Sequence, residues 1–425
     1  MRRLFAACLL TVAAALVAVP AVAANDPLLP QQWGLDKIGA QKAWSVARGD
    51  GVVIAVVDSG VDLNHVDLKA KLVPGANFVE PGRPPQDDCG HGTHVAGIAA
   101  AATDNGVGVA GVAPGARIMP VRVLGSDGSG GCGGSDVSAG IRWAADHGAR
   151  VINMSLGSDT EAVFGPSFSD AIRYAWSKGA ICVVAAGNQF VLSSGFADEP
   201  AIVVAATDRN DAKPLYSSGV GSAQWGMSAP GGAGNVIGPS TSAVDILSTY
   251  FDPSRPDDHS EYATLAGTSM ATPFVSGAAA VLLSMGLTKE QVVQRLLSTA
   301  DNVGSSSTFG HGRLNLDRAV HSAEPAPSPS SIHRTSGAGA AATAVPTSSA
   351  GRVPNAGRTT TSPPTARAAV TPQASASVSG PYAAPQEPPS HRSGAPLRAT
   401  AAAVVGVAAA LAGGWALYRL THRAH

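Results

Sequence analysis

The feature that most constrains the fold is a series of short apolar runs between Trp33 and about Val320, separated by amphipathic stretches. The runs are continuously apolar and rich in β-branched residues, which is typical of strands buried on both faces. Strands that alternate with helices favour an α/β domain with a parallel sheet. The runs are GVVIAVV, RIMPVRVL, ARVINMSL, AICVVAAG and AIVVAAT, and the helical stretches are DVSAGIRWAADHG, SFSDAIRYAWSKG and TKEQVVQRLLSTA.

The two ends of the chain carry apolar runs of a different kind. Two arginines precede the first run, and small residues up to Ala24 follow it, which predicts a secretory signal peptide over residues 1–24. The alternative is an uncleaved anchor helix. The second run, from Ala399 to Tyr418, is long enough to span a bilayer and has Arg419 after it. We therefore predict a transmembrane helix over 398–418 and a cytoplasmic tail over 419–425, the alternative being a buried helix of the globular domain.

Between these ends the composition changes abruptly after His321. Residues 322–397 are dominated by Ala, Pro, Ser, Thr and Gly and have no apolar period, so this segment cannot bury enough surface to fold. We expect a disordered stalk there and a folded domain over residues 25–321. The formal net charge is −1 and no long basic run occurs, so nucleic acid is not an implied partner.

Three motifs place an aspartate, a histidine and a serine at element ends. Asp58 ends the buried run in VIAVVDSGVD, His91 opens a helix in GHGTHVAGIAAA, and Ser269 opens another in AGTSMATPFVSGAAAVLL. The strand end is where open α/β sheets place their active sites. There Asp58 would orient the ring of His91, which would act as the general base for Ser269. Pro273 is expected in the first turn of the serine helix, where a missing N–H costs little.

A fourth motif supplies a hydrogen-bond donor. The apolar run ICVVAAGNQ ends with Asn188, whose side chain could donate to an oxyanion that develops during the reaction. Each of the four residues has a structural alternative, as a cap or turn residue, and His91 with His94 could also form a metal pair. The four together, each at a strand or helix end, favour the catalytic interpretation.

These motifs closely resemble those of the subtilisin-like serine proteases, or subtilases. VVDSGVD, HGTHVAG, AAGN and GTSMATP match the family's Asp, His, oxyanion-hole and Ser motifs over roughly residues 33–320. The resemblance implies a three-layer α/β/α domain around a mainly parallel sheet. It also implies a serine endopeptidase in which Asp58, His91, Ser269 and Asn188 are catalytic and no cofactor takes part in the reaction.

The resemblance further implies a substrate groove in which a protein or peptide binds as an added strand. One edge is Gly128, Ser129 and Gly130, and the other is Ser155, Leu156 and Gly157. The primary pocket would lie between the second edge and a wall of small residues, Ala185, Ala186 and Gly187.

Two accessory features follow from the same resemblance. The stretch ATDNGVGVAGVAP is similar to a loop that holds structural Ca²⁺, with ligands from Asp67, Thr103, Asn105, Val107 and Val109. Family members often add an N-terminal glutamine, but Gln31 and Gln32 lie slightly out of register. Cys89 and Cys132 both neighbour the cleft, so we expect a disulfide between them, with Cys182 as a buried free thiol.

The overall layout resembles the mycosins, which are membrane-anchored subtilases associated with type VII secretion. This resemblance implies a single-pass protein of the cell membrane with an extracytoplasmic catalytic domain and an association with a secretion complex. Two other hypotheses are a non-catalytic scaffold with a subtilase fold and a stalked surface-binding protein. The complete set of four catalytic residues favours an active enzyme.

Overall fold

The computed structural model describes residues 25–126, 132–134, 136–156, 166–189, 198–234, 238–240 and 242–322. The predicted signal peptide, the stalk beyond Ser322, the membrane helix and the tail lie outside these residues. Among the helices that the structure describes, none is long and apolar enough to cross a bilayer.

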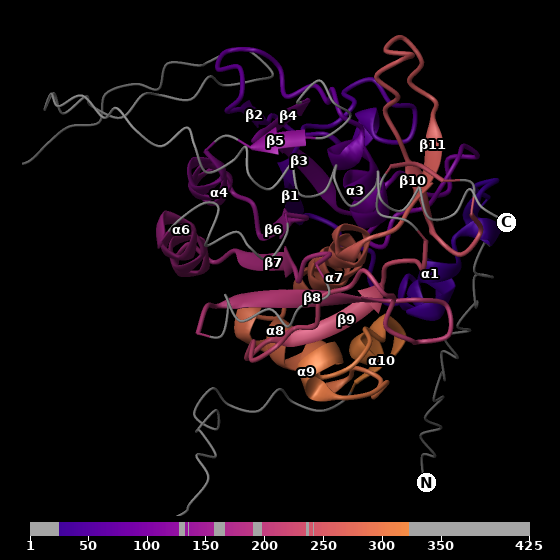
Figure 1. Cartoon of the computed structure of the whole chain (residues 1–425), viewed down its shortest axis with the longest axis vertical. Helices are drawn as coiled ribbons and strands as arrows, with labels where there is room; N and C mark the ends of the chain where they lie inside the picture. Colours follow the sequence, from indigo (N-terminus) through magenta and orange to yellow (C-terminus); the bar gives the residue numbers. More distant parts are fainter. Residues whose placement is uncertain are drawn as a thin grey trace, which may run out of the picture. The chain divides into compact units, whose positions relative to one another are not determined.

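A seven-stranded parallel sheet forms the centre of the described domain (Figure 1). All of its neighbouring strands pair in parallel. In spatial order the strands are β2 (Ala76–Asn77), β3 (Arg117–Arg122), β1 (Val53–Asp58), β6 (Val151–Met154), β7 (Ile181–Ala185), β8 (Ala201–Thr207) and β9 (Gly226–Pro230). The five predicted apolar runs form β1, β3, β6, β7 and β8.

Helices cover both faces of the sheet and complete the three-layer α/β/α architecture expected from the sequence. On one face pack α1 (Trp33–Lys37), α2 (Ala40–Ala43), α3 (His91–Ala100), α7 (Thr268–Ser284), α8 (Lys289–Ser298) and α10 (Leu316–His321). On the other face pack α4 (Val137–Asp146) and α6 (Pro166–Ser177), as Figure 1 shows. Alternate residues of β1 enter different cores: Ile54 and Val56 face the first set of helices, and Ala55 and Val57 face the second.

Smaller elements border the sheet. Two antiparallel pairs are formed by β4 (Leu124–Ser126) with β5 (Cys132–Gly134) and by β10 (Ile246–Thr249) with β11 (Tyr262–Leu265). The remaining helix is α9 (Ser306–Phe309), and two short 3₁₀ turns cover Leu29–Gln31 and Lys69–Lys71.

The strand order creates a switch point at β1. After β1 the chain forms the edge strand β2 and returns through α3 to β3, on one side of β1. It then passes through α4 to reach β6 on the other side. The two connections lie on opposite faces of the sheet, so a crevice opens at the carboxyl end of β1. Asp58, the last residue of β1, therefore lies where a parallel sheet of this kind places its functional groups.

Candidate active site

Asp58 and His91 form a hydrogen-bonded pair at this switch point. Asp58 is fully buried, whereas the His91 side chain, on the first residue of α3, keeps 26% of its surface exposed. The ring Nδ1 of His91 donates to Oδ1 of Asp58 at 2.8 Å, and the backbone N–H of Ser59 donates to the same oxygen at 2.7 Å. The proton on Nδ1 leaves the opposite ring nitrogen of a neutral imidazole free to accept a proton.

The charge around His91 favours its protonated form. Burial pushes the pKa of His91 down, but the carboxylate of Asp58, its hydrogen bond to the ring and the charge of Asp87 outweigh that effect. The net result is a pKa above the usual range for histidine. The site thus stabilises an imidazolium, which is the state that a general base reaches after it has taken a proton.

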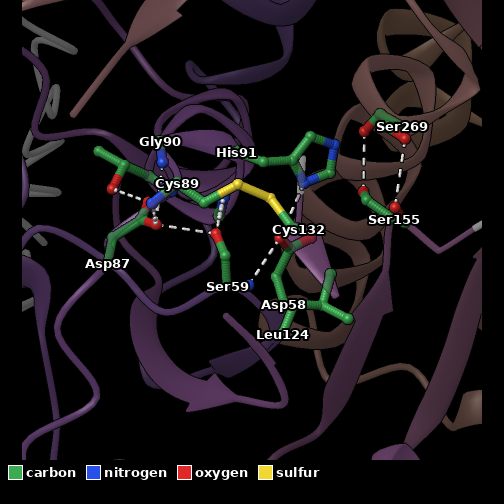
Figure 2. A network of polar contacts seen from close by, with 12 residues as sticks. Asp58, Ser59, Asp87, Cys89, Gly90, His91, Leu124, Cys132, Ser155 and Ser269 are labelled. Carbon is green, nitrogen blue, oxygen red and sulfur yellow. Dashed lines mark hydrogen bonds and ion pairs between the residues drawn. A yellow bond between two sulfur atoms is a disulfide. The ribbon is translucent and has the colours of Figure 1, made fainter. Parts of the chain in front are cut away.

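Ser269 is the second residue of α7 and contacts the end of β6. Its hydroxyl donates to the backbone carbonyl of Ser155 at 3.2 Å, and the Ser155 hydroxyl donates to the Ser269 carbonyl at 2.8 Å. Figure 2 shows the ring of His91 beside this pair of serines, with one ring nitrogen bonded to Asp58 and the other on the side of Ser269. No hydrogen bond joins Ser269 and His91 in the described part of the chain. Catalytic hydrogen bonds of this kind often tighten only when substrate is bound.

The position of Pro273 corrects a sequence prediction. It is the sixth residue of α7 and therefore lies in the second turn, not in the first. A proline there lacks the N–H that would bond to the carbonyl four residues earlier, which belongs to Ser269. The Ser155 hydroxyl bonds to that carbonyl instead. The proline thus frees the Ser269 carbonyl for a contact with the segment that follows β6.

Asn188 follows β7 and is oriented by Thr268, the residue before Ser269. Its Oδ1 accepts from both the backbone N–H and the hydroxyl of Thr268, each at 3.0 Å. A backbone N–H can only donate, so Oδ1 must face Thr268 and the Nδ2 group must face away from it. A Cβ on Gly267 would stand 3.4 Å from Nδ2, so a side chain at this position would cover the amide donor.

The residues predicted for the substrate groove fall into two groups. Ser155 and Leu156 follow β6. Ala185 ends the adjacent strand β7, and Ala186 and Gly187 follow it, so the strand pairing brings these segments together. Gly128, Ser129, Gly130 and Gly157 lie outside the described residues. The β4–β5 pair flanks the first of these gaps, with Ser126 opposite Cys132. The groove residues stay predictions.

The disulfide expected from the sequence is present. Cys89 and Cys132 are bridged, with their Cα atoms 6.2 Å apart. The bridge joins the segment that leads into His91 to strand β5, as Figure 2 shows. Cys182 is a free thiol buried in β7, where burial raises its pKa to about 12. It is therefore protonated and unreactive at neutral pH.

The loop after α3 has the oxygen donors that a calcium ion requires. Asp67 is fully buried, and its two carboxylate oxygens accept from the Asn105 side chain at 2.7 Å, the Val109 N–H at 2.9 Å and the Tyr262 hydroxyl at 2.9 Å. Thr103 and Val107 lie on the same loop. No group of three or more His, Cys, Asp or Glu gathers in the described regions, so a cation here would depend on amide and carbonyl oxygens as well.

Asp26 is a member of this cluster that the sequence analysis missed. It is 3% exposed and accepts from the backbone N–H groups of Asp104 at 3.0 Å and Asn105 at 3.2 Å. Burial raises its pKa, backbone hydrogen bonds oppose that rise, and the charges of Asp104 and Asp67 add to it. Neither Asp26 nor Asp67 pairs with a lysine or arginine that the structure describes. Two buried carboxylates facing one loop fit a hard cation.

Gln32 explains why the expected glutamine is out of register. Its side chain accepts from the N–H of Ala110 at 2.7 Å and donates to the carbonyl of Ala110 at 2.8 Å. Both the oxygen and the nitrogen of the Gln32 amide therefore bind the backbone of Ala110. The signal that could have identified Asp26 is its acidic side chain in the short polar start of the domain.

Comparisons with known proteins identify the family of this chain. Residues 49–312 match the model of the Subtilase family. The chain is 42% identical over 300 residues to thermitase from Thermoactinomyces vulgaris, which covers 70% of this chain and 98% of that protein. It is 37% identical over 294 residues to subtilisin Savinase from Lederbergia lenta, covering 68% of this chain and 98% of that protein.

Solved structures give the same result. A protease from Pseudoalteromonas arctica aligns with a TM-score of 0.62 and 32% identity, covering 70% of this chain and 98% of that chain. Fervidolysin from Fervidobacterium pennivorans, a keratinolytic enzyme related to subtilisin, aligns with a TM-score of 0.56 and 31% identity over 71% of this chain and 47% of that one. The chain therefore belongs to the subtilase family. It is a subtilisin-like serine protease, as its motifs indicated.

Proposed function

We propose that this protease is an endopeptidase in which Ser269 is the nucleophile, His91 the general base and Asp58 the residue that orients the ring. The observation that carries the proposal is the 2.8 Å hydrogen bond between His91 and Asp58 at the end of β1. It holds the ring in the tautomer that can accept a proton from a serine. Ser269 supplies that serine from the start of α7.

The reaction proceeds in two halves. In the first, the Ser269 hydroxyl leaves the Ser155 carbonyl, its proton passes to His91, and Oγ attacks the peptide carbonyl carbon. The charge on the carbonyl oxygen is met by Nδ2 of Asn188 and the N–H of Ser269, and His91 then protonates the departing amine. In the second half, water attacks the acyl-enzyme with His91 again as the base, which releases the acid and restores Ser269.

The proposed substrate is a protein or peptide held in extended form. Main-chain hydrogen bonds to Ser155 and to the edge near Gly128–Gly130 would accept most sequences. The wall formed by Ala185, Ala186 and Gly187 is small and apolar, which favours an apolar side chain in the primary pocket.

We also propose that Ca²⁺ binds at the loop after α3. Asp26, Asp67 and Asn105 would supply side-chain oxygens, and Thr103, Val107 and Val109 would supply backbone carbonyls. The ion would offset the repulsion between the two buried carboxylates. Its role is structural, because the loop follows the end of α3 opposite to His91.

The proposed location is the outer face of the cell membrane. The support comes from the sequence: a signal peptide over 1–24, a stalk over 322–397 and a spanning helix over 398–418. This layout also supports a proposed association with a secretion complex.

A fluorophosphonate probe tests the catalytic proposal directly, because only an activated serine reacts with it. Wild-type protein should be labelled at Ser269, and Ser269→Ala should not be labelled while its thermal melt stays unchanged. His91→Ala should be labelled much more slowly. A wild-type protein that folds but neither reacts with the probe nor cleaves casein would indicate a scaffold instead.

Truncation after residue 321 tests the anchoring proposal. The shortened protein should leave the membrane fraction and keep its peptidase activity and melting temperature, because the stalk would contribute few packing contacts. Recovery of the truncated protein in the membrane pellet would contradict the proposed anchor. A soluble product that is inactive would show that the tail supports the protease.

A further inference from the structure

A second buried carboxylate, Asp87, contacts the residues next to Asp58 and His91 in the chain. It is 1% exposed and belongs to the segment that leads into α3 (Figure 2). It accepts five hydrogen bonds with lengths between 2.5 and 2.9 Å, and no lysine or arginine pairs with it in the described part of the chain. The donors are the Ser59 hydroxyl, the backbone N–H groups of Cys89, Gly90 and Thr93, and the Thr93 hydroxyl.

The hydrogen-bond partners of Asp87 favour its ionised form. The Ser59 hydroxyl accepts from the N–H of Gly92, and the Thr93 hydroxyl accepts from the N–H of Asp62. Each hydroxyl keeps its own proton to donate to Asp87. With three backbone N–H groups and two hydroxyls directed at it, the carboxyl group is surrounded by donors, which stabilise a carboxylate. Burial raises the pKa of Asp87, and its hydrogen bonds from Thr93, Cys89 and Gly90 oppose that rise.

The network joins both partners of the catalytic pair. Through Cys89, Gly90 and Thr93, Asp87 binds the backbone on either side of His91 and satisfies N–H groups at the start of α3. Through Ser59 it reaches Asp58, because the Ser59 N–H donates to the Asp58 oxygen that His91 contacts. One buried charge therefore connects the ring and the carboxylate that orients it.

The turn into α3 is closely packed at Gly90. Gly90 has a φ of +86°, and a Cβ there would lie 2.4 Å from the carbonyl oxygen of Phe251. Position 90 therefore accepts only glycine, and Tyr250 and Phe251 pack against it. The inner side of the turn is held by Asp87.

Several charged or titratable groups surround His91 and Asp87. They are Asp58 from β1, His94 one turn further along α3, Tyr250 from the end of β10, and Arg122 from β3, which contacts Gln86 and Asp88 beside Asp87. Burial lowers the pKa of His94 to about 3, so this ring is neutral. Asp58 and Asp87 are thus the charges that favour protonation of His91.

We propose that Asp87 is a positioning residue for catalysis, which fixes the geometry of the His91–Asp58 pair through Ser59 and the start of α3 and adds negative charge behind the ring. It touches neither substrate nor reacting atoms and acts only through the pair. The inference rests on the proposed function, because it assumes that His91 is the general base.

Two variants separate the charge of Asp87 from its contacts. Asp87→Asn removes the charge and replaces one acceptor oxygen by a donor, so kcat/KM per active site should fall about ten- to one-hundredfold. The acid limb of the pH–rate profile should also move to lower pH, because a ring without this neighbouring charge loses its proton more readily. Ser59→Ala keeps the charge of Asp87 and removes the hydroxyl that links it to Ser59 and to the Gly92 N–H, so kcat should fall while the acid limb keeps its place. Titration with a fluorophosphonate probe counts the active sites in each sample.

A readout without catalysis keeps the test independent of the proposed function. The His91 ring can be titrated by NMR in a Ser269→Ala background, where Asp87→Asn should lower its pKa. Asp88→Asn is the matched control: it removes the neighbouring charge, which pairs with Arg122 at 2.7 Å outside the network, and should shift the ring much less.

The outcomes decide between a catalytic and a purely structural role. A folded Asp87→Asn protein with unchanged kcat/KM and an unmoved His91 titration overturns the proposal. If Asp87→Asn does not fold, a Ser59→Ala protein that keeps the wild-type kcat overturns the proposal. A wild-type protein that fails to react with the probe, but whose His91 titration still responds to Asp87→Asn, would refute the proposed function and keep the electrostatic link.

Discussion

The two sides of the catalytic cleft are held in place by different kinds of contacts. On the His91 side, two fully buried carboxylates, Asp58 and Asp87, organise the start of α3. On the Ser269 side the contacts are neutral: Ser155 bonds to Ser269, and Thr268 bonds to Asn188. A further neutral chain runs from Ser276 through Asn153 to Ser155, at 2.8 and 3.0 Å.

The difference matches the charges that develop during the reaction. The imidazole becomes positive when it takes a proton, and fixed negative charge beside it lowers the energy of that state. In the proposed mechanism the peptide oxygen becomes negative, and neutral donors such as Nδ2 of Asn188 would stabilise it. A carboxylate on the Ser269 side would oppose the oxyanion. The protein thus places buried charge on one wall of the cleft and dipoles on the other.

The largest expected effect tests whether Ser269 is the reacting group on the neutral side. Ser269→Ala removes the nucleophile and should lower kcat by about a millionfold, leaving a residual rate from binding and the oxyanion donors. Hydrolysis of a chromogenic peptide measures the effect, and a thermal melt checks the fold. Ser155→Ala, which loses only the contact to the Ser269 carbonyl, is the comparison. Similar losses in both variants would remove Ser269 from its assigned role.

The next effect tests the charged side. Asp58→Asn should lower kcat by about ten-thousandfold near neutral pH, because the amide cannot hold the His91 tautomer or stabilise the imidazolium. The pKa of His91 is raised by Asp58, so the acid limb of the pH–rate profile should move to lower pH in the variant. Asp62→Asn is the matched control, a fully buried carboxylate that pairs with His259 instead. An equal loss in the control would point to general destabilisation.

A smaller effect is expected at the oxyanion donor. Asn188→Ala should lower kcat by about 100- to 1,000-fold with little change in KM, because the donor acts on charge present only in the transition state. Asn188→Asp keeps the shape but places a carboxylate on the neutral side, and its kcat should be lower still. The comparison of the two walls would be wrong if the aspartate variant were the more active of the two.

The sequence predicted the parts of both walls that depend on local patterns. Asp58, His91, Asn188 and Ser269 each lie at an element end that a short motif marks, and the five strongest apolar runs became strands. Strands β2 and β9 were missed because Ala76–Asn77 and Gly226–Pro230 have few β-branched residues and depend on their neighbours for pairing.

The contacts that distinguish the two walls were not predictable in the same way. The bond from Ser155 to Ser269 joins residues 114 positions apart, and the one from Asp26 to Asp104 joins residues 78 apart. No periodicity in the sequence records which distant side chains meet. Asp87 is close to His91 in the chain, but its importance depends on Ser59 and therefore on the end of β1.

The covalent link on the His91 side should contribute to stability more than to chemistry. Replacing Cys89 and Cys132 together by serine should lower the free energy of unfolding by about 2–4 kcal/mol, because the bridge restricts the unfolded chain over a separation of 43 residues. Denaturant melts measure the loss. Dithiothreitol should destabilise the wild type and leave the double variant unchanged, whereas Cys182→Ala should respond to the reductant like the wild type. A reductant effect that persists in the double variant would contradict the assignment.

The smallest expected effect concerns the loop after the opposite end of α3, where Asp26 and Asp67 are both buried. Folding without a cation raises the pKa of Asp26, so ionisation of this group costs stability as the pH rises through that pKa. Bound Ca²⁺ would reverse the sign of this contribution to stability, since it favours the ionised form and adds about 3 kcal/mol at a hundred times its Kd.

Chelation with EGTA at neutral pH should therefore lower the melting temperature, and Asp26→Asn should remove most of that response. Asp104→Asn is the matched control, because the Asp104 side chain pairs with Arg48 at 2.6 Å. If EGTA lowers the melting temperature of Asp26→Asn as much as that of the wild type, Asp26 is not a ligand and its buried charge needs another explanation.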